Sequence, residues 1–100
     1  MIARVWRGEV PKAKSAQYLH LMRTVALPDY RAVAGNRGAW CLVRDVGEAT
    51  QFEMLTLWDD VGAIKAFAGE DYERAKYYEF DADYLLRMDP TVMHYEAHAG

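Results

Sequence analysis

The chain has 100 residues and a mass of 11.5 kDa, which predicts a single domain with one hydrophobic core. Hydrophobic residues make up 52% of the sequence and charged residues 27%, a balance too apolar for intrinsic disorder. The formal net charge of -3 argues against nucleic acid as a partner, because nucleic-acid binders usually carry a basic surface.

The cysteine and histidine content indicates a cytoplasmic protein without a metal site. Cys41 is the only cysteine, which excludes an internal disulfide and a multi-cysteine zinc site and is typical of a reducing compartment. The three histidines are scattered, with no carboxylate at ligand spacing. No apolar run approaches the ~20 residues that span a bilayer, and the opening residues do not form a signal peptide, so no membrane partner is expected.

The first part of the chain predicts a strand followed by a helix. Met1–Gly8 has the alternation and the β-branched and aromatic residues of a strand. Pro11 suits the first turn of a helix that we place from Lys12 to about Leu27, and Pro28 either ends this helix or begins a second short turn. The expected buried face of the helix consists of Tyr18, Leu21, Met22 and Val25.

The second part predicts a hairpin, a second helix and a last strand. The loop Gly35–Gly38 leads into two strands that are joined by a turn at 47–49. Asp59 and Asp60 can cap the following helix, which Gly69 is suited to end. The expected later elements are strands at Ala39–Val46, Gln51–Trp58 and Thr91–Ala97, a helical stretch at Tyr72–Tyr78, and an ambiguous segment at Phe80–Met88.

This β-α-β-β-α-β order predicts the α+β class and the ferredoxin-like fold. Right-handed crossovers then give a four-stranded antiparallel sheet with both helices on one face. The strands carry apolar side chains on both faces, so either choice of covered face leaves a large apolar patch. We expect a second copy of the chain to cover that patch, which makes the protein a homodimer through its open sheet face. The alternative is a monomer in which Tyr77–Leu86 folds back over the free face.

With Trp58 closing the third strand, the whole chain resembles the antibiotic biosynthesis monooxygenase family of the dimeric α+β barrel superfamily. The resemblance spans residues 1–100 as a single domain. It is carried by IARVWRG at 2–8, AGNRG at 34–38, FEMLTLWDD at 52–60, AIKAFAGEDYERAKYY at 63–78 and HYE at 94–96.

The resemblance implies a monooxygenase that oxidises a quinol- or anthrone-like aromatic small molecule without a metal, flavin or haem cofactor. Such an enzyme needs an apolar cavity that excludes water and one or two polar groups that handle a proton. Other readings of the same fold are a non-catalytic ligand-binding or stress-response module, an isomerase, and a haem-degrading protein.

The sequence departs from the family pattern at three positions. Oxygenases of the family carry an asparagine four residues before the tryptophan of the third strand, where this chain has Met54. The haem-degrading branch carries an asparagine and a histidine at positions that match Arg7 and Lys76. Only Trp58 remains of that trio, so haem degradation is disfavoured.

Two residues are catalytic candidates. His94 lies in the last strand and could act as the general base, because an imidazole titrates near neutral pH; the other reading is a structural histidine. Trp58 could stack on a planar ligand or anchor the core. Trp6 and Tyr18 are expected to shape the substrate cavity with them.

Three more residues are candidates for substrate binding. Arg4 could orient an anionic or phenolate substrate, or form a cross-strand ion pair with Glu96 or Glu53. Asn36 could rim the pocket or only form the turn. Tyr78 could donate a hydrogen bond to a developing oxyanion, or belong to a tyrosine-rich interface.

Overall fold

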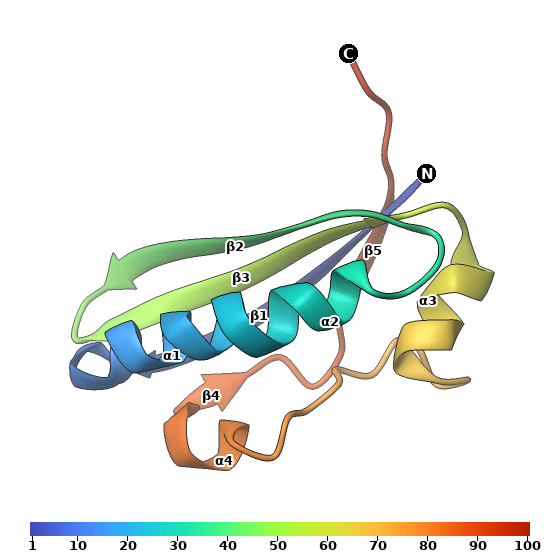
Figure 1. Ribbon diagram of the computed structural model, residues 1–100. Helices are drawn as coiled ribbons and strands as arrows, with labels where there is room; N and C mark the ends of the chain where they lie inside the picture. The colour runs from blue at the N-terminus through green and yellow to red at the C-terminus, as the bar shows by residue number, and fades with distance from the viewer.

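The computed structural model describes residues 1–100 and is built on one antiparallel sheet in the order β2-β3-β1, with β4 and β5 both paired to the outer edge of β1 (Figure 1). This is the ferredoxin-like order, and the α+β prediction is confirmed. The last strand is divided into two short pieces, so the sheet has five strands rather than the four expected. The strands are β1 (Ile2–Pro11), β2 (Asn36–Val46), β3 (Ala49–Trp58), β4 (Arg87–Met88) and β5 (Met93–Glu96).

The first helical region runs without a break from residue 12 to residue 31, past the proline that was expected to interrupt it. It comprises η1 (Lys12–Lys14), α1 (Ser15–Leu21), the wide π-type turn η2 (Met22–Ala26) and α2 (Leu27–Arg31). Pro28 lies two positions after the last residue of the wide turn, so the turn that precedes it already departs from α-helical hydrogen bonding.

The wide turn also decides which side chains are buried. The buried residues are spaced by four: Tyr18, Met22, Ala26 and Tyr30. In a regular α-helix such a spacing drifts around the axis by about 40° at each step, because one residue turns the chain by about 100°. A turn with more residues reduces that drift and keeps all four on one face. Val25, which regular helical periodicity placed in the buried stripe, is exposed instead.

The second helix, α3 (Val61–Ala68), begins and ends as its sequence predicts. The Asp60 side chain accepts a 2.9 Å hydrogen bond from the amide of Ala63, and Gly69 ends the helix with a φ of +89°. Ile64 and Phe67 are its buried side chains. The stretch Tyr72–Tyr78 was expected to be helical, but it contains no helix. The ambiguous region that follows it contains α4 (Asp81–Tyr84) and β4.

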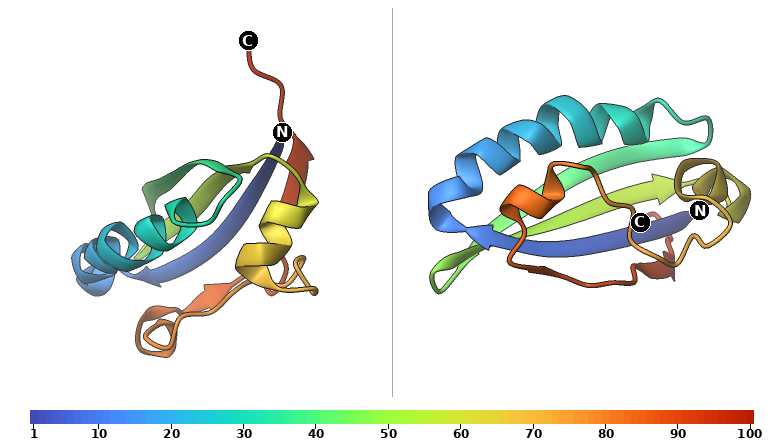
Figure 2. Two further views of the ribbon diagram at one scale, coloured as in Figure 1. Left: turned by 45° about the vertical axis from the view of Figure 1, so that its right-hand side comes forward. Right: turned by 90° about the horizontal axis from the view of Figure 1, so that it is seen from below.

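Both helical regions lie on one side of the sheet, and the chain between α3 and β5 crosses on that same side (Figure 2). Alternate residues of β3, from Thr50 to Trp58, are buried on this helix-covered face. The alternative in which Tyr77–Leu86 covers the other face is therefore wrong, because Tyr78 and Asp81 pack among residues of the helix-covered side. No helix is long and apolar enough to cross a membrane.

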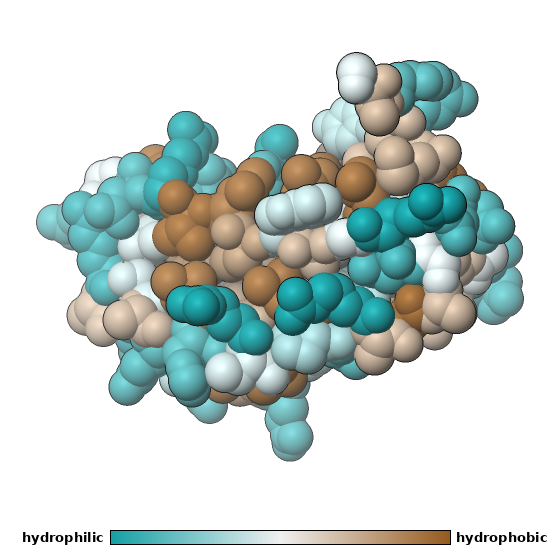
Figure 3. All heavy atoms as spheres, turned by 45° about the horizontal axis from the view of Figure 1, so that its top comes forward, coloured by the Kyte–Doolittle hydropathy of each residue, from teal (hydrophilic) through white to brown (hydrophobic).

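The opposite face of the sheet is uncovered and carries a band of apolar side chains (Figure 3). Trp40 and Leu42 of β2 lie there with 47% and 44% of their surface exposed. Met93 and Tyr95 continue the band on β5, which pairs with β1 at Val5 and Ala3. The expectation of an apolar open face is thus met within one chain.

A candidate ligand cavity between the helices and the sheet

A small cavity lies between the sheet and the first helical region. The part of the chain after α3 that contributes Lys76, Tyr78 and Asp81 covers its remaining side, and we call this part the closing segment. Its volume is about 10 Å³, which is enough for about one water molecule. A planar organic ligand therefore enters only if the closing segment moves. The lining residues are Trp6, Tyr18, Met22, Ala26, Tyr30, Met54, Lys76, Tyr78 and Asp81. Three of the five substrate-binding candidates, Trp6, Tyr18 and Tyr78, are thus brought together here.

Trp6 owes its position to the glycine two residues further along β1. A Cβ atom added to Gly8 would lie 2.5 Å from Cη2 of Trp6, so the indole lies across the bare backbone of that glycine. The Trp6 side chain is buried, and its Nε1 atom has no hydrogen-bond partner. The tryptophan thus contributes both a flat apolar surface and an unused donor to the sheet side of the cavity.

Asp81 is the polar residue of the cavity that the sequence did not reveal. It is a buried carboxylate that accepts a 2.8 Å hydrogen bond from the hydroxyl of Tyr18 and another of 2.8 Å from the amide of Tyr78. Burial raises its pKa more than these two donors lower it. A carboxyl group with a raised pKa at a cavity wall can take up and release a proton.

The phenols that line the cavity are held in their neutral form. Burial, followed by the neighbouring Asp81 charge, raises the pKa of Tyr18. Burial also raises the pKa of Tyr78, whose hydroxyl donates to Asp29, and raises the pKa of Tyr30 to about 12. Neutral phenols can donate hydrogen bonds to an oxygen that gains negative charge during a reaction.

A line of polar contacts connects the closing segment to the surface. Lys76 Nζ lies 3.5 Å from a carboxylate oxygen of Asp29, which also accepts from Tyr78. The same ammonium lies 4.2 Å from the ring centre of Phe67 on α3. Asp29 and Lys76 are both partly exposed, so this pair forms the solvent-facing end of the cavity wall.

Arg4 is buried with 1% of its surface exposed and does not form either of the ion pairs considered for it. Glu53 pairs with Arg7 on the open face, and Glu96 lies near His98. Strand alternation directs Arg4 to the helix-covered side and so separates it from Glu53. Glu96, in contrast, lies opposite Ile2 on the same face as Arg4 and pairs with no arginine. The guanidinium carbon of Arg4 lies 5.5 Å from the ring centre of Phe67.

His94 is the direct cross-strand neighbour of Arg4 in the β1–β5 pairing. Its ring lies 5.2 Å from that of Tyr72, and its Nε2 atom is buried without a partner. Burial and the charge of Arg4 lower the pKa of His94. The imidazole is therefore neutral at pH 7, as a general base must be, although His94 does not line the present cavity.

The other two candidates lie elsewhere in the molecule. Trp58 is fully buried, donates a 2.8 Å hydrogen bond to Thr56 Oγ1 and packs 5.6 Å from the ring of Phe67. Asn36 hydrogen-bonds the main chain of Gly38 and Leu57 at the start of β2, which is the turn-forming role. The structure therefore places Trp58 in the core and Asn36 at a β-bulge.

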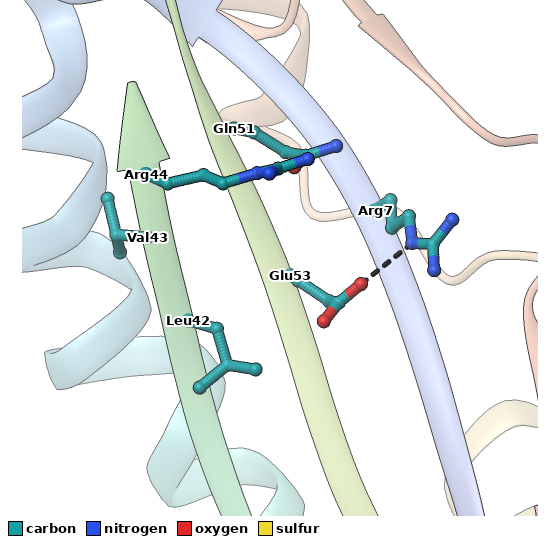
Figure 4. A pocket seen from close by; sticks show the side chains of 6 residues that line it. All are labelled: Arg7, Leu42, Val43, Arg44, Gln51 and Glu53. Atoms are coloured by element: carbon teal, nitrogen blue, oxygen red, sulfur yellow. Dashed lines mark hydrogen bonds and ion pairs between the residues drawn. The ribbon is translucent and has the colours of Figure 1, made fainter. Parts of the chain in front are cut away.

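A larger hollow of about 350 Å³ lies on the open face of the sheet, and it is shallow and partly polar (Figure 4). It is lined by Arg7, Leu42, Val43, Arg44, Gln51 and Glu53. The ion pair between Arg7 Nε and Glu53, at 2.7 Å, crosses it. This hollow does not exclude water, so we place the candidate site on the helix-covered side.

Comparison with solved structures supports the architecture over the whole chain. A protein from Bacillus cereus described as a "putative antibiotic biosynthesis monooxygenase" matches with a TM-score of 0.65 and 14% identity, over 99% of this chain and 92% of that one. The fold is that of the antibiotic biosynthesis monooxygenase-like structures. The resemblance inferred from the sequence is confirmed at the level of the fold.

Two further structures agree. Rv0793 from Mycobacterium tuberculosis matches with a TM-score of 0.66 and 16% identity, over 99% of this chain and 96% of that one. An uncharacterized NIPSNAP domain protein from Burkholderia xenovorans gives a TM-score of 0.67 at 16% identity, with 99% and 96% covered. No protein-family model and no curated protein matches this chain. The likeness is one of fold.

Proposed function

We propose that the protein is a cofactor-independent monooxygenase that oxidises an aromatic, quinol- or anthrone-like small molecule. One observation carries the proposal: a small cavity with aromatic walls holds a buried carboxyl group, Asp81, whose pKa is raised. A site of this kind excludes water and handles one proton, which are the two requirements of the reaction. The fold shared with the Bacillus cereus protein supports it.

With an anthrone-like substrate, the reaction converts an activated methylene group and O₂ into a carbonyl group and water. Removal of a proton from the substrate gives a carbanion that transfers one electron to O₂, and the two radicals combine to a peroxide. The peroxide then loses water to form the quinone. The substrate supplies all the electrons, and the protein supplies a base, a donor for the developing oxyanion and a dry cavity.

We propose two alternative residues as the base. His94 is neutral at pH 7 and has an unpartnered Nε2 atom, and Asp81 lies directly in the cavity wall. Tyr18 and Tyr78 are the donors for the oxyanion, while Trp6 provides the surface on which a planar ring stacks. Trp58 supports this arrangement from the core.

The active form that we propose is a cytoplasmic homodimer formed through the open face of the sheet. The support is the exposed apolar band of β2 and β5 on that face. Removing such a patch from water is favourable by about 25 cal/mol per Å², and a two-fold axis lets the same surface serve both chains.

The test is oxygen uptake by the purified protein with a panel of hydroquinones and anthrones. We expect stoichiometric O₂ consumption and quinone formation with at least one of them. His94→Ala and Asp81→Asn separate the two candidate bases, because the variant that lacks the true base should turn over more slowly by a factor of about 10² or more. His20→Ala is the matched control, because His20 is an exposed residue of the first helical region.

The competing function is a ligand-binding module without turnover. A bound quinol that quenches tryptophan fluorescence but consumes no oxygen would decide for that function and against the oxygenase. The cavity alone is compatible with binding, so oxygen consumption is the decisive measurement.

A further inference from the structure

Arg4 is a buried charge that the protein itself does not neutralise. None of the ion pairs in the structure includes it. Its only side-chain hydrogen bond runs from Nη2 to the main-chain carbonyl of Arg74, at 3.2 Å, and its Nε has no partner. A guanidinium has five N–H donors, and a buried, unpaired charge costs several kcal/mol. A bound anion would offset this unfavourable free energy.

Two other unpartnered polar atoms lie on the same face of the sheet close to Arg4. His94 is its direct neighbour on β5, and its buried Nε2 makes no hydrogen bond. Trp6 is the next residue of β1 on that face, and its buried Nε1–H makes none either. Arg4, Trp6 and His94 are the only residues with a buried side-chain nitrogen or oxygen left without a partner.

The Nε and Nη2 atoms lie on the same edge of the guanidinium, where an arginine binds a carboxylate with two parallel hydrogen bonds. In this structure one of the two is free and the other holds the Arg74 carbonyl. That carbonyl belongs to the segment between α3 and α4, which has no helix or strand. Moving this segment both opens the cavity and frees the whole edge of Arg4.

We propose that Arg4, with His94 and Trp6 beside it, binds the carboxylate of the substrate, and that the carbonyl of Arg74 occupies this position when the site is empty. The inference rests on the proposed function and names its substrate class: a planar aromatic that carries a carboxylate group. The ring occupies the cavity at Trp6, and the carboxylate replaces the loop carbonyl at the guanidinium.

The first test needs no ligand. Arg4→Met keeps an unbranched side chain as far as the position of Nε and removes the charged end of the guanidinium. If Arg4 is kept for binding, the midpoint of thermal unfolding stays the same or rises in the variant, because an unpaired buried charge is lost. A fall of more than about 5 °C, read on a scale of about 4–8 °C per kcal/mol, would show that Arg4 stabilises the fold and would overturn the proposal. Arg31→Met, at an exposed position, is the control.

The second test measures binding of benzoate and 2-naphthoate, with benzamide and 2-naphthamide as neutral partners, by quenching of tryptophan fluorescence. We expect at least one carboxylate to bind at least tenfold more tightly than its amide, and Arg4→Met to abolish that difference. Arg31→Met should change the affinity less than twofold. Equal affinity for acid and amide, equal loss in both variants, or no binding of either carboxylate up to about 10 mM would overturn the proposal.

The outcomes separate this inference from the oxygenase. Carboxylate binding that depends on Arg4, with no oxygen consumption by any quinol, keeps the anion site and removes the monooxygenase. Oxygen consumption with a quinol, together with equal affinity for each carboxylate and its amide, keeps the monooxygenase and removes the anion site.

Discussion

Tyr18 donates a hydrogen bond to Asp81 across 63 positions of sequence, and this buried contact helps to join the first helical region to the segment that closes the cavity. The Asp81 carboxylate has a second bond to the amide of Tyr78 and no cation beside it in any ion pair. The closing segment is therefore held in place by a charge that burial disfavours.

The first prediction follows from the raised pKa of Asp81. The folded protein holds this proton more tightly than the unfolded chain does, so the contribution of Asp81 to stability is full below about pH 4 and is lost as pH rises through the folded pKa. Asp81→Asn removes this dependence. Denaturant unfolding should show that the free energy of unfolding of the variant increases relative to that of the wild type between pH 4 and pH 7. A difference that does not change with pH would contradict the assignment.

The matching variant Asp81→Ala tests the hydrogen bonds instead of the charge. It leaves the buried Tyr18 hydroxyl without its acceptor, and we expect a loss of about 1–3 kcal/mol in the free energy of unfolding. Asp83→Ala, at an exposed position on α4, is the control and should change stability by less than about 0.5 kcal/mol.

A second prediction concerns the packing of Trp6 on Gly8. Gly8→Ala places a Cβ atom 2.5 Å from the indole, so the ring must move, and we expect a loss of about 1–3 kcal/mol. Trp6→Phe removes the far ring atoms that cause the clash. The double variant should therefore be more stable than the sum of the two single changes predicts, as a double-mutant cycle measures. Additive effects would refute the contact.

A third prediction addresses the homodimer proposed for the open face. Sedimentation at micromolar concentration should give twice the 11.5 kDa of one chain. Leu42→Lys places a charge in the apolar band and should shift the mass towards one chain. Leu86→Lys, at an exposed leucine of the segment after α4, should leave the dimer intact. A wild-type protein that sediments as a single chain would contradict the proposal.

A fourth prediction concerns His94. Its pKa is lowered by burial and by Arg4, so an NMR titration should place it below about 6.5. The contribution to stability is full above that value and is lost as pH falls through the folded pKa. In Arg4→Met the pKa should rise, because one of the two causes is removed, while the nearby Glu73 continues to raise it. An unchanged titration would show that the two side chains do not interact.

The regular part of the fold could be predicted from the sequence because its signals are local. Alternation placed β2 and β3, a glycine turn placed their hairpin, and Asp60 and Gly69 marked the ends of α3. The two faces of the sheet followed from the same alternation. These patterns depend on neighbours within a few positions, which one sequence contains in full.

The cavity could be predicted only in part. Trp6, Tyr18 and Tyr78 were expected there, since aromatic residues on inward faces meet in a core this small. Asp81 was missed because an aspartate in an irregular segment has the signature of a surface residue, and its burial involves a contact with Tyr18, which is distant in sequence. The burial of Arg4 without a carboxylate was missed for the converse reason. Sequence patterns favour an ion pair, but the strand register places Glu53 on the other face of the sheet, and Glu96 lies near His98 instead.

The break between β4 and β5 ties the entrance of the cavity to the rim of the sheet. The carbonyl of Pro90 accepts from the amide of Ala75, and the amide of Val92 donates to the carbonyl of Glu73, so the residues around Arg74 are fastened to the strand that continues to His94. A ligand that displaces the Arg74 carbonyl, as proposed above, would therefore also strain these two hydrogen bonds. We therefore expect ligand entry to be coupled to a loosening of β5 at the edge of the sheet.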